Sequence, residues 1–464
     1  MTASAARLVM PAICWDDADG YAPARAAVDD ALALGVGGFI LFGGERAAAR
    51  RLVEDLRAAA PHPLLIASDL ERGAGQQLAG LTPLPPLRAL AALGADAVAE
   101  AAAITAAEAR DIGINWVFAP VCDLDIEAAN PIVQTRSFGA DAFEVGDLAA
   151  RWIARCQAAG VLACAKHFPG HGRTVADSHA TLPVVEAGHE LNRDLTPFRR
   201  AVAADVATVM TAHVAYPRWD QSGAPATYSR SIVTGLLRRD LFFGGLVVTD
   251  ALIMDGARAQ GGEAAGAAAV IQAGGDILLY PREPRVAAGG LADLDVTGPL
   301  RRLDAALGRT APPAPLADAA VATHRERGRA LARQAVQVLQ GDVRALRGAA
   351  AVEIVDDDAG GPYPLPPRTA FAEALARAGV ALRPDGERIV LLFADVKGWK
   401  GRAGLSADSR RRLGALLERP ATVVAFGHPR RVADVPGDGP VLCAWSGDTL
   451  MQEAAAHRLV SGTG

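Results

Sequence analysis

The chain has few cysteines, and nothing in their spacing suggests pairing. Five occur in 464 residues without any C-x-x-C pair, at Cys14, Cys122, Cys156, Cys164 and Cys443. An odd, scattered set indicates reduced thiols in a cytoplasm. Cys122 and Cys164 lie in strand-like apolar runs, so we expect them to pack as small buried hydrophobic groups.

Long apolar runs, a signal peptide and basic clusters are also missing. No stretch approaches the ~20 uninterrupted apolar residues of a membrane span. No basic segment precedes an apolar run near residue 1, and Asp16 and Asp17 come early, so we predict a cytoplasmic protein. The formal charge is -5, and the densest basic run, at 410–412, is typical of a solvated helix face. These features argue against nucleic-acid and membrane partners.

Hydrophobic residues are 51% of the chain, and short apolar runs alternate with Ala-rich helical stretches. The predicted strands are 8–12, 38–42, 64–67, 114–119, 162–165, 207–211, 246–249 and 276–280. The helices between them include 24–34, 46–60, 96–111, 143–159, 193–204 and 263–273. Continuously apolar strands indicate a parallel sheet buried on both faces, and this repetition predicts an α/β fold, a (β/α)8 TIM-type barrel. A doubly wound open sheet is the alternative.

A proline-rich stretch at 310–315 separates the barrel from a second region. We predict a catalytic barrel over 1–310, a linker and helix over 311–345, and a small α/β domain over 346–464. The helix should cover about 316–340. Strands are expected at 351–355, 388–393, 422–426 and 441–444, and helices at 370–378, 408–417 and 450–459.

Polar residues collect directly after the predicted strands, on the face where barrels carry their active sites. They are Asp69, Glu71 and Arg72 after the third run, Asp123 and Asp125 after the fourth, Lys166 and His167 after the fifth, His213 after the sixth and Asp250 after the seventh. The densest group is KHFPGHG at 166–172, followed by DSH at 177–179. A buried strand that ends in a Gly/Pro loop rich in titratable groups indicates chemistry rather than core packing.

These motifs resemble glycoside hydrolase family 3, in its β-N-acetylglucosaminidase branch. In chain order they are NP at 130–131, RSFG at 136–139, KHFPGHG with DSH, MTAH at 210–213 and VTDALIM at 248–254. AFGHP at 425–429 and MQEAA at 451–455 resemble the second domain of the family. The set covers most of the predicted barrel.

The resemblance implies a role for each matching residue. Asp250 would be the nucleophile that forms a covalent glycosyl-enzyme, and His179 the general acid and then base, with Asp177 as its partner. The substrate-binding residues would be Asp69, Arg136, Lys166, His167, Met210 and His213. The partner would be a small saccharide, and no cofactor or metal is expected.

This chemistry is consistent with the residue types. Retaining glycosidases split the displacement in two through a carboxylate nucleophile. A histidine with an ordinary pKa of about 6.5 can transfer the proton near neutral pH, and Asp177 can orient its other ring nitrogen. A neutral histidine would not repel an anionic acceptor, so phosphorolysis is a credible variant.

Other interpretations of single residues stay open. Asp250 and Asp69 could cap the segments that follow them, and Lys166 could form a Schiff base, as in barrel aldolases. Asp123 and Asp125 are expected to order loops, and His213 could serve packing as well as ligand contact. His171 is expected to hold the Gly-rich loop, His179 could be a surface histidine, and a metal on His167, His171 and His179 is restricted by Pro169.

The chain departs from the family at one point. Many members carry an acidic–Gly-Gly-Arg pattern after the aspartate that corresponds to Asp69, whereas Arg72 comes earlier here. The sugar contact of that arginine is therefore not carried over to Arg72.

The leading hypothesis is an exo-acting, retaining β-N-acetylglucosaminidase for cell-wall- or chitin-derived saccharides, with a role in peptidoglycan recycling. A β-N-acetylglucosaminide phosphorylase, a family 3 β-glucosidase and a non-catalytic sugar-binding protein are the alternatives. The sequence does not indicate the oligomeric state.

Overall fold

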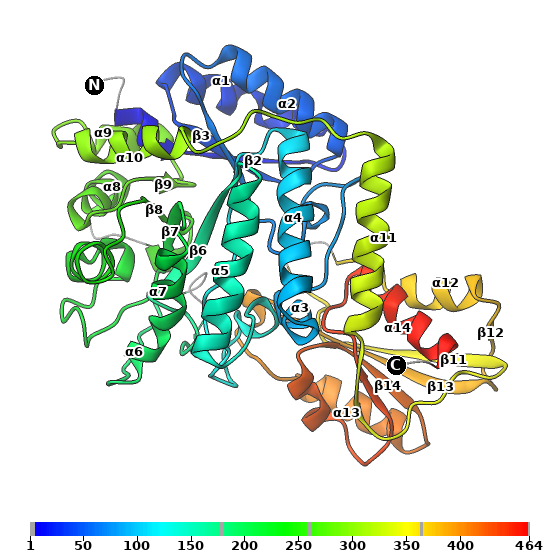
Figure 1. Ribbon diagram of the computed structural model, residues 1–464. Helices are drawn as coiled ribbons and strands as arrows, with labels where there is room; N and C mark the ends of the chain where they lie inside the picture. Colours follow the sequence, from blue (N-terminus) through cyan, green and yellow to red (C-terminus); the bar gives the residue numbers. More distant parts are fainter. Residues whose placement is uncertain (1–4, 177–180, 258–260, 362–364, 463–464) are drawn as a thin grey trace.

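The computed structural model describes residues 5–176, 181–257, 261–361 and 365–462 (Figure 1). Parallel strands hydrogen-bond in chain order: β2 (Ala12–Cys14), β3 (Gly38–Phe42), β4 (Leu65–Ser68), β5 (Trp116–Val117), β6 (Leu162–Phe168), β7 (Thr208–Thr211) and β8 (Leu246–Thr249). The ring closes through β9 (Leu278–Leu279), which is linked to β8 by a bridge between Val248 and Ile277 and pairs with β1 (Val9–Met10). Pro11, which has no N–H group, separates β1 from β2. The predicted barrel is confirmed.

Helices follow the strands and cover the outside of the barrel (Figure 1). They are α1 (Arg25–Leu34), α2 (Arg46–Ala59), α3 (Leu87–Leu93), α4 (Ala95–Ile112), α5 (Ala142–Ala158), α6 (Leu191–Asp194), α7 (Thr196–Ala203), η6 (Ser231–Asp240), α8 (Gly262–Ala273), α9 (Pro284–Gly289) and α10 (Thr297–Leu307). Strand β6 is buried along its whole length, as a strand between the barrel interior and a helix layer must be. Helix α2 buries Ala49, Val53 and Leu56, the 3.6-residue spacing of one helix face.

The C-terminal sheet unit consists of a second sheet, ordered β10-β15-β14-β13-β11-β12, with helices α12, α13 and α14. Its strands are β10 (Gln337–Gln340), β11 (Ala349–Asp356), β12 (Ala381–Leu382), β13 (Glu387–Ala394), β14 (Thr422–Gly427) and β15 (Val441–Cys443). Its helices are α12 (Ala370–Arg377), α13 (Ala407–Leu417) and α14 (Thr449–Ser461). All neighbouring strands are parallel except β10 and β15.

One predicted element is wrong in part. The helix expected over 316–340 is α11 (Asp318–Ala335), which ends at the extended residue Val336. The following four residues form β10, because their backbone pairs with β15 about a hundred positions further along the chain. Local sequence carries no signal for such a long-range pairing. The short edge strand β12 was also not predicted.

Helix α11 joins the two parts of the molecule. It packs against α3 and α4 of the barrel and against α14 of the C-terminal sheet unit (Figure 1). Ala332 and Ala335 of α11 and Ala89 of α3 belong to one hydrophobic cluster with the second sheet. Helix α11 thus packs on the barrel and on the C-terminal sheet unit at once. The predicted domain boundaries at residues 310 and 345 therefore stay a prediction.

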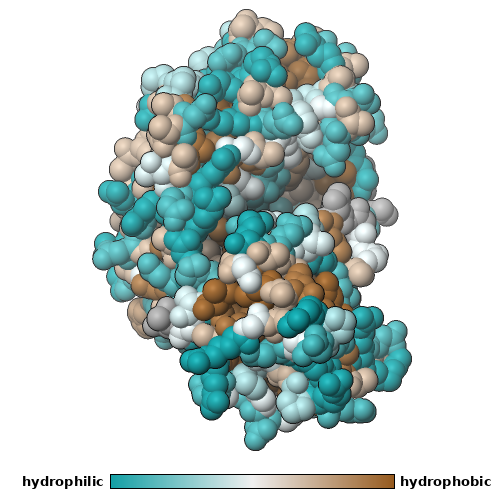
Figure 2. Space-filling model, turned by 90° about the vertical axis from the view of Figure 1, so that its right-hand side faces the viewer, coloured by the Kyte–Doolittle hydropathy of each residue, from teal (hydrophilic) through white to brown (hydrophobic). Residues whose placement is uncertain are grey.

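The surface of the molecule is mainly hydrophilic. On the face shown in Figure 2, apolar residues gather in one patch in the lower half of the view. Among the described residues, no helix has both the length and the apolar character needed to cross a membrane.

Candidate active site

A cavity of about 550 Å³ lies at the C-terminal ends of the barrel strands. Its wall carries side chains from the last residues of β6 and β7 and from the residues after β4 and β8, among them Asp69, Glu71, Lys166, His167, Met210 and Asp250. Strand β6 runs to Phe168, three residues further than predicted, so Lys166 and His167 belong to the strand itself. The C-terminal sheet unit also contributes to the wall, through Leu365, Asp395, Val396, Lys397 and Trp399. The cavity is therefore where the strand-end residues of the sequence meet.

Lys166 and Arg136 share a buried carboxylate in this wall. The Nζ atom of Lys166 lies 2.7 Å from Oδ1 of Asp69 and 2.7 Å from Oε1 of Glu71. Arg136 binds the same Glu71 through two hydrogen bonds, Nε to Oε2 at 3.0 Å and Nη2 to Oε1 at 2.7 Å. Glu71 thus joins the predicted binding residues Lys166 and Arg136, and Lys166 links them to Asp69. The sequence pattern predicts Glu71 at a strand end but indicates no role for it.

The charges of this cluster are held in their ionised forms. Burial alone would raise the pKa of Glu71, but Arg136 and Lys166 outweigh it and hold that pKa well below its usual value. Burial would lower the pKa of Lys166, but Asp69 and Glu71 outweigh it and raise that pKa above its usual value. A permanently charged ammonium is a poor nucleophile, so the Schiff-base interpretation of Lys166 is not supported.

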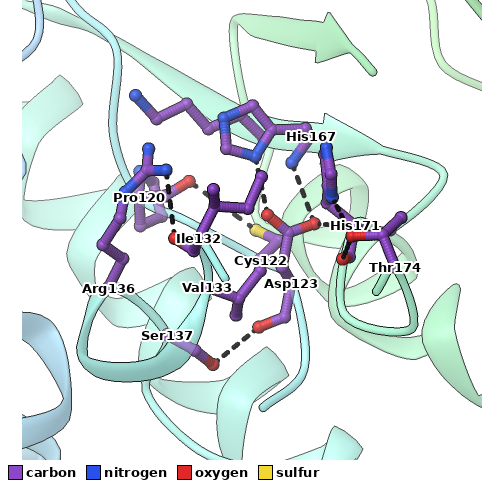
Figure 3. A network of polar contacts seen from close by, with 12 residues as sticks. Pro120, Cys122, Asp123, Ile132, Val133, Arg136, Ser137, His167, His171 and Thr174 are labelled. Atoms are coloured by element: carbon purple, nitrogen blue, oxygen red, sulfur yellow. Dashed lines mark hydrogen bonds and ion pairs between the residues drawn. The ribbon is translucent and has the colours of Figure 1, made fainter. Parts of the chain in front are cut away.

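The carboxylate of Asp123 contacts the ring of His167 and the backbone of His171 (Figure 3). Nδ1 of His167 lies 2.6 Å from Oδ2 of Asp123, and the backbone N–H groups of His167 and His171 donate to Oδ1 at 3.2 and 2.6 Å. Asp123 is fully buried, and burial would raise its pKa, but the two histidines lower it. Asp123 therefore orders this loop, as predicted, and it also fixes the His167 ring at the cavity.

The Gly/Pro loop after β6 is anchored from several sides. Nδ1 of His171 is 2.7 Å from Oγ1 of Thr174, and Nδ2 of Asn130 donates to the carbonyl of His171 at 2.9 Å. Gly172 packs so closely that a Cβ atom there would lie 2.1 Å from the carbonyl oxygen of Leu124. Burial lowers the pKa of His171 to about 4, so the ring is neutral, as a structural role requires.

Asp177 and His179, the predicted acid/base pair, lie outside the described residues. The anchored segment ends at Ala176, and the chain is described again from Thr181. Their roles stay predictions.

Asp250 follows β8 and lines the cavity. Its backbone N–H donates to the carbonyl of Thr211 at 3.1 Å, and its Oδ1 accepts from the N–H of Ala251 at 2.8 Å. Met210, at the end of β7, lies in the same wall. The carboxylate predicted as nucleophile thus shares one cavity with the predicted sugar-binding residues.

His213 has a different position from the one expected for a substrate-binding residue. It is fully buried and does not line the cavity. Its Nε2 lies 3.2 Å from the carbonyl of Ala251, and its Nδ1 lies 2.9 Å from Oγ1 of Thr227. His213 therefore supports the segment that carries Asp250, and its contact with substrate stays a prediction.

Arg72 lies at the cavity, although the family pattern places an arginine later. Its Nη1 is 3.5 Å from Oδ2 of Asp448 in the C-terminal sheet unit. Its backbone N–H donates to Oε1 of Gln76 at 2.8 Å, and both residues line the cavity. Arg72 therefore forms an ion pair that links the barrel to the C-terminal sheet unit, in addition to lining the cavity.

The cysteines are free, and four of the five are buried. Burial raises the pKa of Cys164 and of Cys443 to about 12 in each case, so both are unreactive thiols. Within the described ranges, no group of three or more His, Cys, Asp or Glu side chains could hold a metal ion.

Comparison with known proteins agrees with this geometry. Residues 4–309 match the sequence model of the glycosyl hydrolase family 3 N terminal domain. A β-hexosaminidase from Thiobacillus denitrificans is 39% identical over 277 residues, which cover 57% of this chain and 76% of that protein. A β-N-acetylglucosaminidase/β-glucosidase from Cellulomonas fimi is 39% identical over 261 residues, 54% of this chain and 46% of that protein.

A solved structure resembles the whole chain. The glycoside hydrolase family 3 β-N-acetylglucosaminidase from Paenibacillus sp. str. FPU-7 superposes with a TM-score of 0.86 at 27% identity, over 100% of this chain and 97% of that one. Together with the charged cavity of the barrel, these matches define the chain as a glycosidase. The chain belongs to glycosyl hydrolase family 3, which confirms the resemblance of its motifs.

Proposed function

We propose that this enzyme is an exo-acting, retaining β-N-acetylglucosaminidase for cell-wall- or chitin-derived saccharides. The proposal is supported by one arrangement: Asp250 shares a cavity with Lys166, Asp69 and the Glu71–Arg136 pair. Charged hydrogen-bonding groups of this kind fix sugar hydroxyl and acetamido groups, and a carboxylate nearby can attack the anomeric carbon. The relatives named above are β-hexosaminidases and β-N-acetylglucosaminidases.

In the proposed reaction, Asp250 attacks the anomeric carbon while His179 protonates the leaving oxygen. The bond to the leaving group breaks as the bond to Oδ of Asp250 forms, which gives a covalent glycosyl-enzyme. His179, now neutral, then removes a proton from water, which displaces Asp250 and restores the carboxylate. A cytoplasmic location belongs to the same proposal and is supported by the five free cysteines.

Phosphorolysis is a second candidate for the same site. The cavity wall carries two cations outside the Lys166–Asp69–Glu71–Arg136 cluster, Arg72 and Lys397, and these attract an anionic acceptor. In that case phosphate would displace Asp250 and leave the sugar as its 1-phosphate.

One assay separates these activities. The purified enzyme is given 4-nitrophenyl N-acetyl-β-glucosaminide or the matching glucoside at several phosphate concentrations. We expect faster release of nitrophenol from the N-acetylglucosaminide, with free N-acetylglucosamine as product. Sugar 1-phosphate would establish phosphorolysis, a preference for the glucoside would establish a β-glucosidase, and binding without turnover would contradict the proposed enzyme.

A further inference from the structure

Lysine is almost absent from this chain. Among 47 lysine and arginine residues only three are lysine: Lys166, Lys397 and Lys400. Lys166 and Lys397 line the cavity, and Lys400 lies three residues after Lys397 in the same loop. All other Lys/Arg positions are arginine, so the few lysines of this chain lie in or near one cavity. An ammonium is a compact, rotatable point charge, so lysine and arginine are not equivalent at a binding site.

Lys400 holds the loop over 395–400 in place. Its side chain is 4% exposed, and its Nζ lies 2.5 Å from Oδ1 of Asp358 and 3.0 Å from the carbonyl of Asp395. The N–H of Asp395 donates to the same Asp358 oxygen at 3.0 Å. Arg368 adds a contact of 3.3 Å to the other oxygen of Asp358. Lys400 is thus neutralised by Asp358 and serves to fix the loop that reaches the cavity.

The charge of Lys397 is not used in this way. Among the described residues, its ammonium makes no hydrogen bond or ion pair, although the side chain lines the cavity. The nearest acid in sequence, Asp395, accepts from the N–H of Val396 at 2.8 Å through Oδ1. Its charge acts on Asp358 only through longer-range electrostatics. Lys397 therefore offers a cation that is not tied up in a described hydrogen bond or ion pair, on a loop that Asp358 and Lys400 anchor.

Trp399 adds an aromatic surface to the same wall. It lines the cavity, and its indole packs so closely on Gly361 that a Cβ atom there would lie 2.3 Å from Cε2 of Trp399. Indole rings held in this way are platforms for the apolar faces of sugar rings. The loop belongs to the C-terminal sheet unit and lies outside the family match, which ends at residue 309.

We propose that Lys397 and Trp399 form an oxyanion-binding subsite on the leaving-group side of the cavity. This rests on the proposed function, in which the terminal N-acetylglucosamine occupies the barrel part of the cavity near Asp250. Trp399 stacks on the next sugar, and Lys397 binds an oxyanion there. The oxyanion is either a carboxylate carried by that sugar or free phosphate in the second step. The first source makes acidic saccharides better substrates than neutral chitin fragments.

The test compares three substrates. They are the aryl N-acetylglucosaminide, which has no second sugar, neutral diacetylchitobiose, and a disaccharide of the same linkage whose leaving sugar carries a carboxylate. Lys397→Met should lower kcat/KM about 10- to 100-fold for the acidic disaccharide, the range for a hydrogen bond to a charged group. The neutral and aryl substrates should change less than twofold. Lys397→Arg should restore part of the loss, and Trp399→Ala should slow both disaccharides several-fold.

A second arm separates the two sources of the oxyanion. The aryl substrate is titrated with inorganic phosphate, and sugar 1-phosphate is measured for the wild type and Lys397→Met. A loss of phosphate dependence in the variant supports free phosphate as the ligand. The control is Arg377→Met, which removes a cation that pairs with Glu453 on the surface of the C-terminal sheet unit, away from the cavity.

The outcomes also separate this inference from the proposed function. If Lys397→Met changes neither arm, the subsite is refuted while the enzyme assignment stands. If the wild type cleaves none of the substrates, the proposed function fails. Calorimetric binding of the acidic disaccharide to the wild type and to Lys397→Met then decides the subsite, and equal affinities would refute it.

Discussion

His428 and Asp125 are hydrogen-bonded across the two parts of the chain, although 303 positions separate them in sequence. Nε2 of His428 lies 2.8 Å from Oδ2 of Asp125, and Nδ1 accepts from the N–H of Arg430 at 3.1 Å. Because Nδ1 accepts, Nε2 carries the proton and donates. Arg430 also reaches Oδ1 of Asp125 at 2.8 Å. Asp125 is two residues from Asp123. The C-terminal sheet unit therefore holds in place, through hydrogen bonds, the segment that orients His167.

This contact predicts that the barrel site depends on a residue of the second sheet unit. His428→Ala should reduce kcat/KM several-fold, because the Asp123 segment loses a fixed point. The coupling energy between His428→Ala and Asp125→Ala should fall within about 0.5–3 kcal/mol, as for residues in direct contact. Urea unfolding and steady-state kinetics of the single and double variants measure it. The dependence would be contradicted if the effects of the two substitutions simply added in the double variant. It would also be contradicted if His428→Ala changed kcat/KM no more than the surface control Arg377→Ala.

Asp250 should be indispensable for turnover. Asp250→Ala removes the carboxylate that attacks the sugar, so kcat on the aryl N-acetylglucosaminide should fall by on the order of 10³-fold or more. Added azide should restore part of the rate by entering the vacated space and giving a glycosyl azide. Activity close to that of the wild type would refute the nucleophile assignment. The retained thermal unfolding transition of the variant serves as the control for folding.

Glu71 should matter for both stability and substrate affinity. Glu71→Gln leaves the buried cation Lys166 and the half-buried Arg136 with less compensating charge. Breaking a buried pair of this kind costs about 3–5 kcal/mol of unfolding free energy, and KM should rise as Lys166 shifts toward Asp69. Glu353→Gln is the matched control, because Glu353 is 39% exposed in its 3.0 Å pair with Arg388. Its cost should stay within about 1 kcal/mol. Equal effects of the two substitutions would contradict the role of Glu71.

His171 should make stability depend on pH in a defined window. Its pKa is lowered to about 4 in the folded protein, below the usual 6.5, so between these values only the unfolded chain binds the proton. The contribution of His171 is therefore complete above pH 6.5 and is lost as the pH falls toward 4, by on the order of 3 kcal/mol. His171→Asn should unfold with a weaker pH dependence in this window. Urea titrations at pH 7.5, 6 and 5, with exposed His457→Asn as control, measure the difference; parallel curves would contradict it.

Strand positions and the face that carries the site were predictable from local sequence. Continuous apolar runs such as β6 can only be buried on both sides, and the polar residues after them must then lie at one rim. That logic predicts that Asp69, Lys166 and Asp250 lie together at one rim of the barrel. Local pattern also gave most of the second sheet, because β13 and β14 are equally apolar.

Only the tertiary structure decided which side chains form ion pairs with one another and which hold a neighbouring segment in place. Glu71 lies between two cations, and His213 stands behind Asp250 rather than in the cavity. Strand β10 replaces the end of a predicted helix because β15 offers it backbone partners. The contacts of His428 with Asp125, and of the Lys397 loop with the cavity, join segments hundreds of residues apart. Periodicity reports the environment of each element, whereas such pairings depend on how separate elements pack in space.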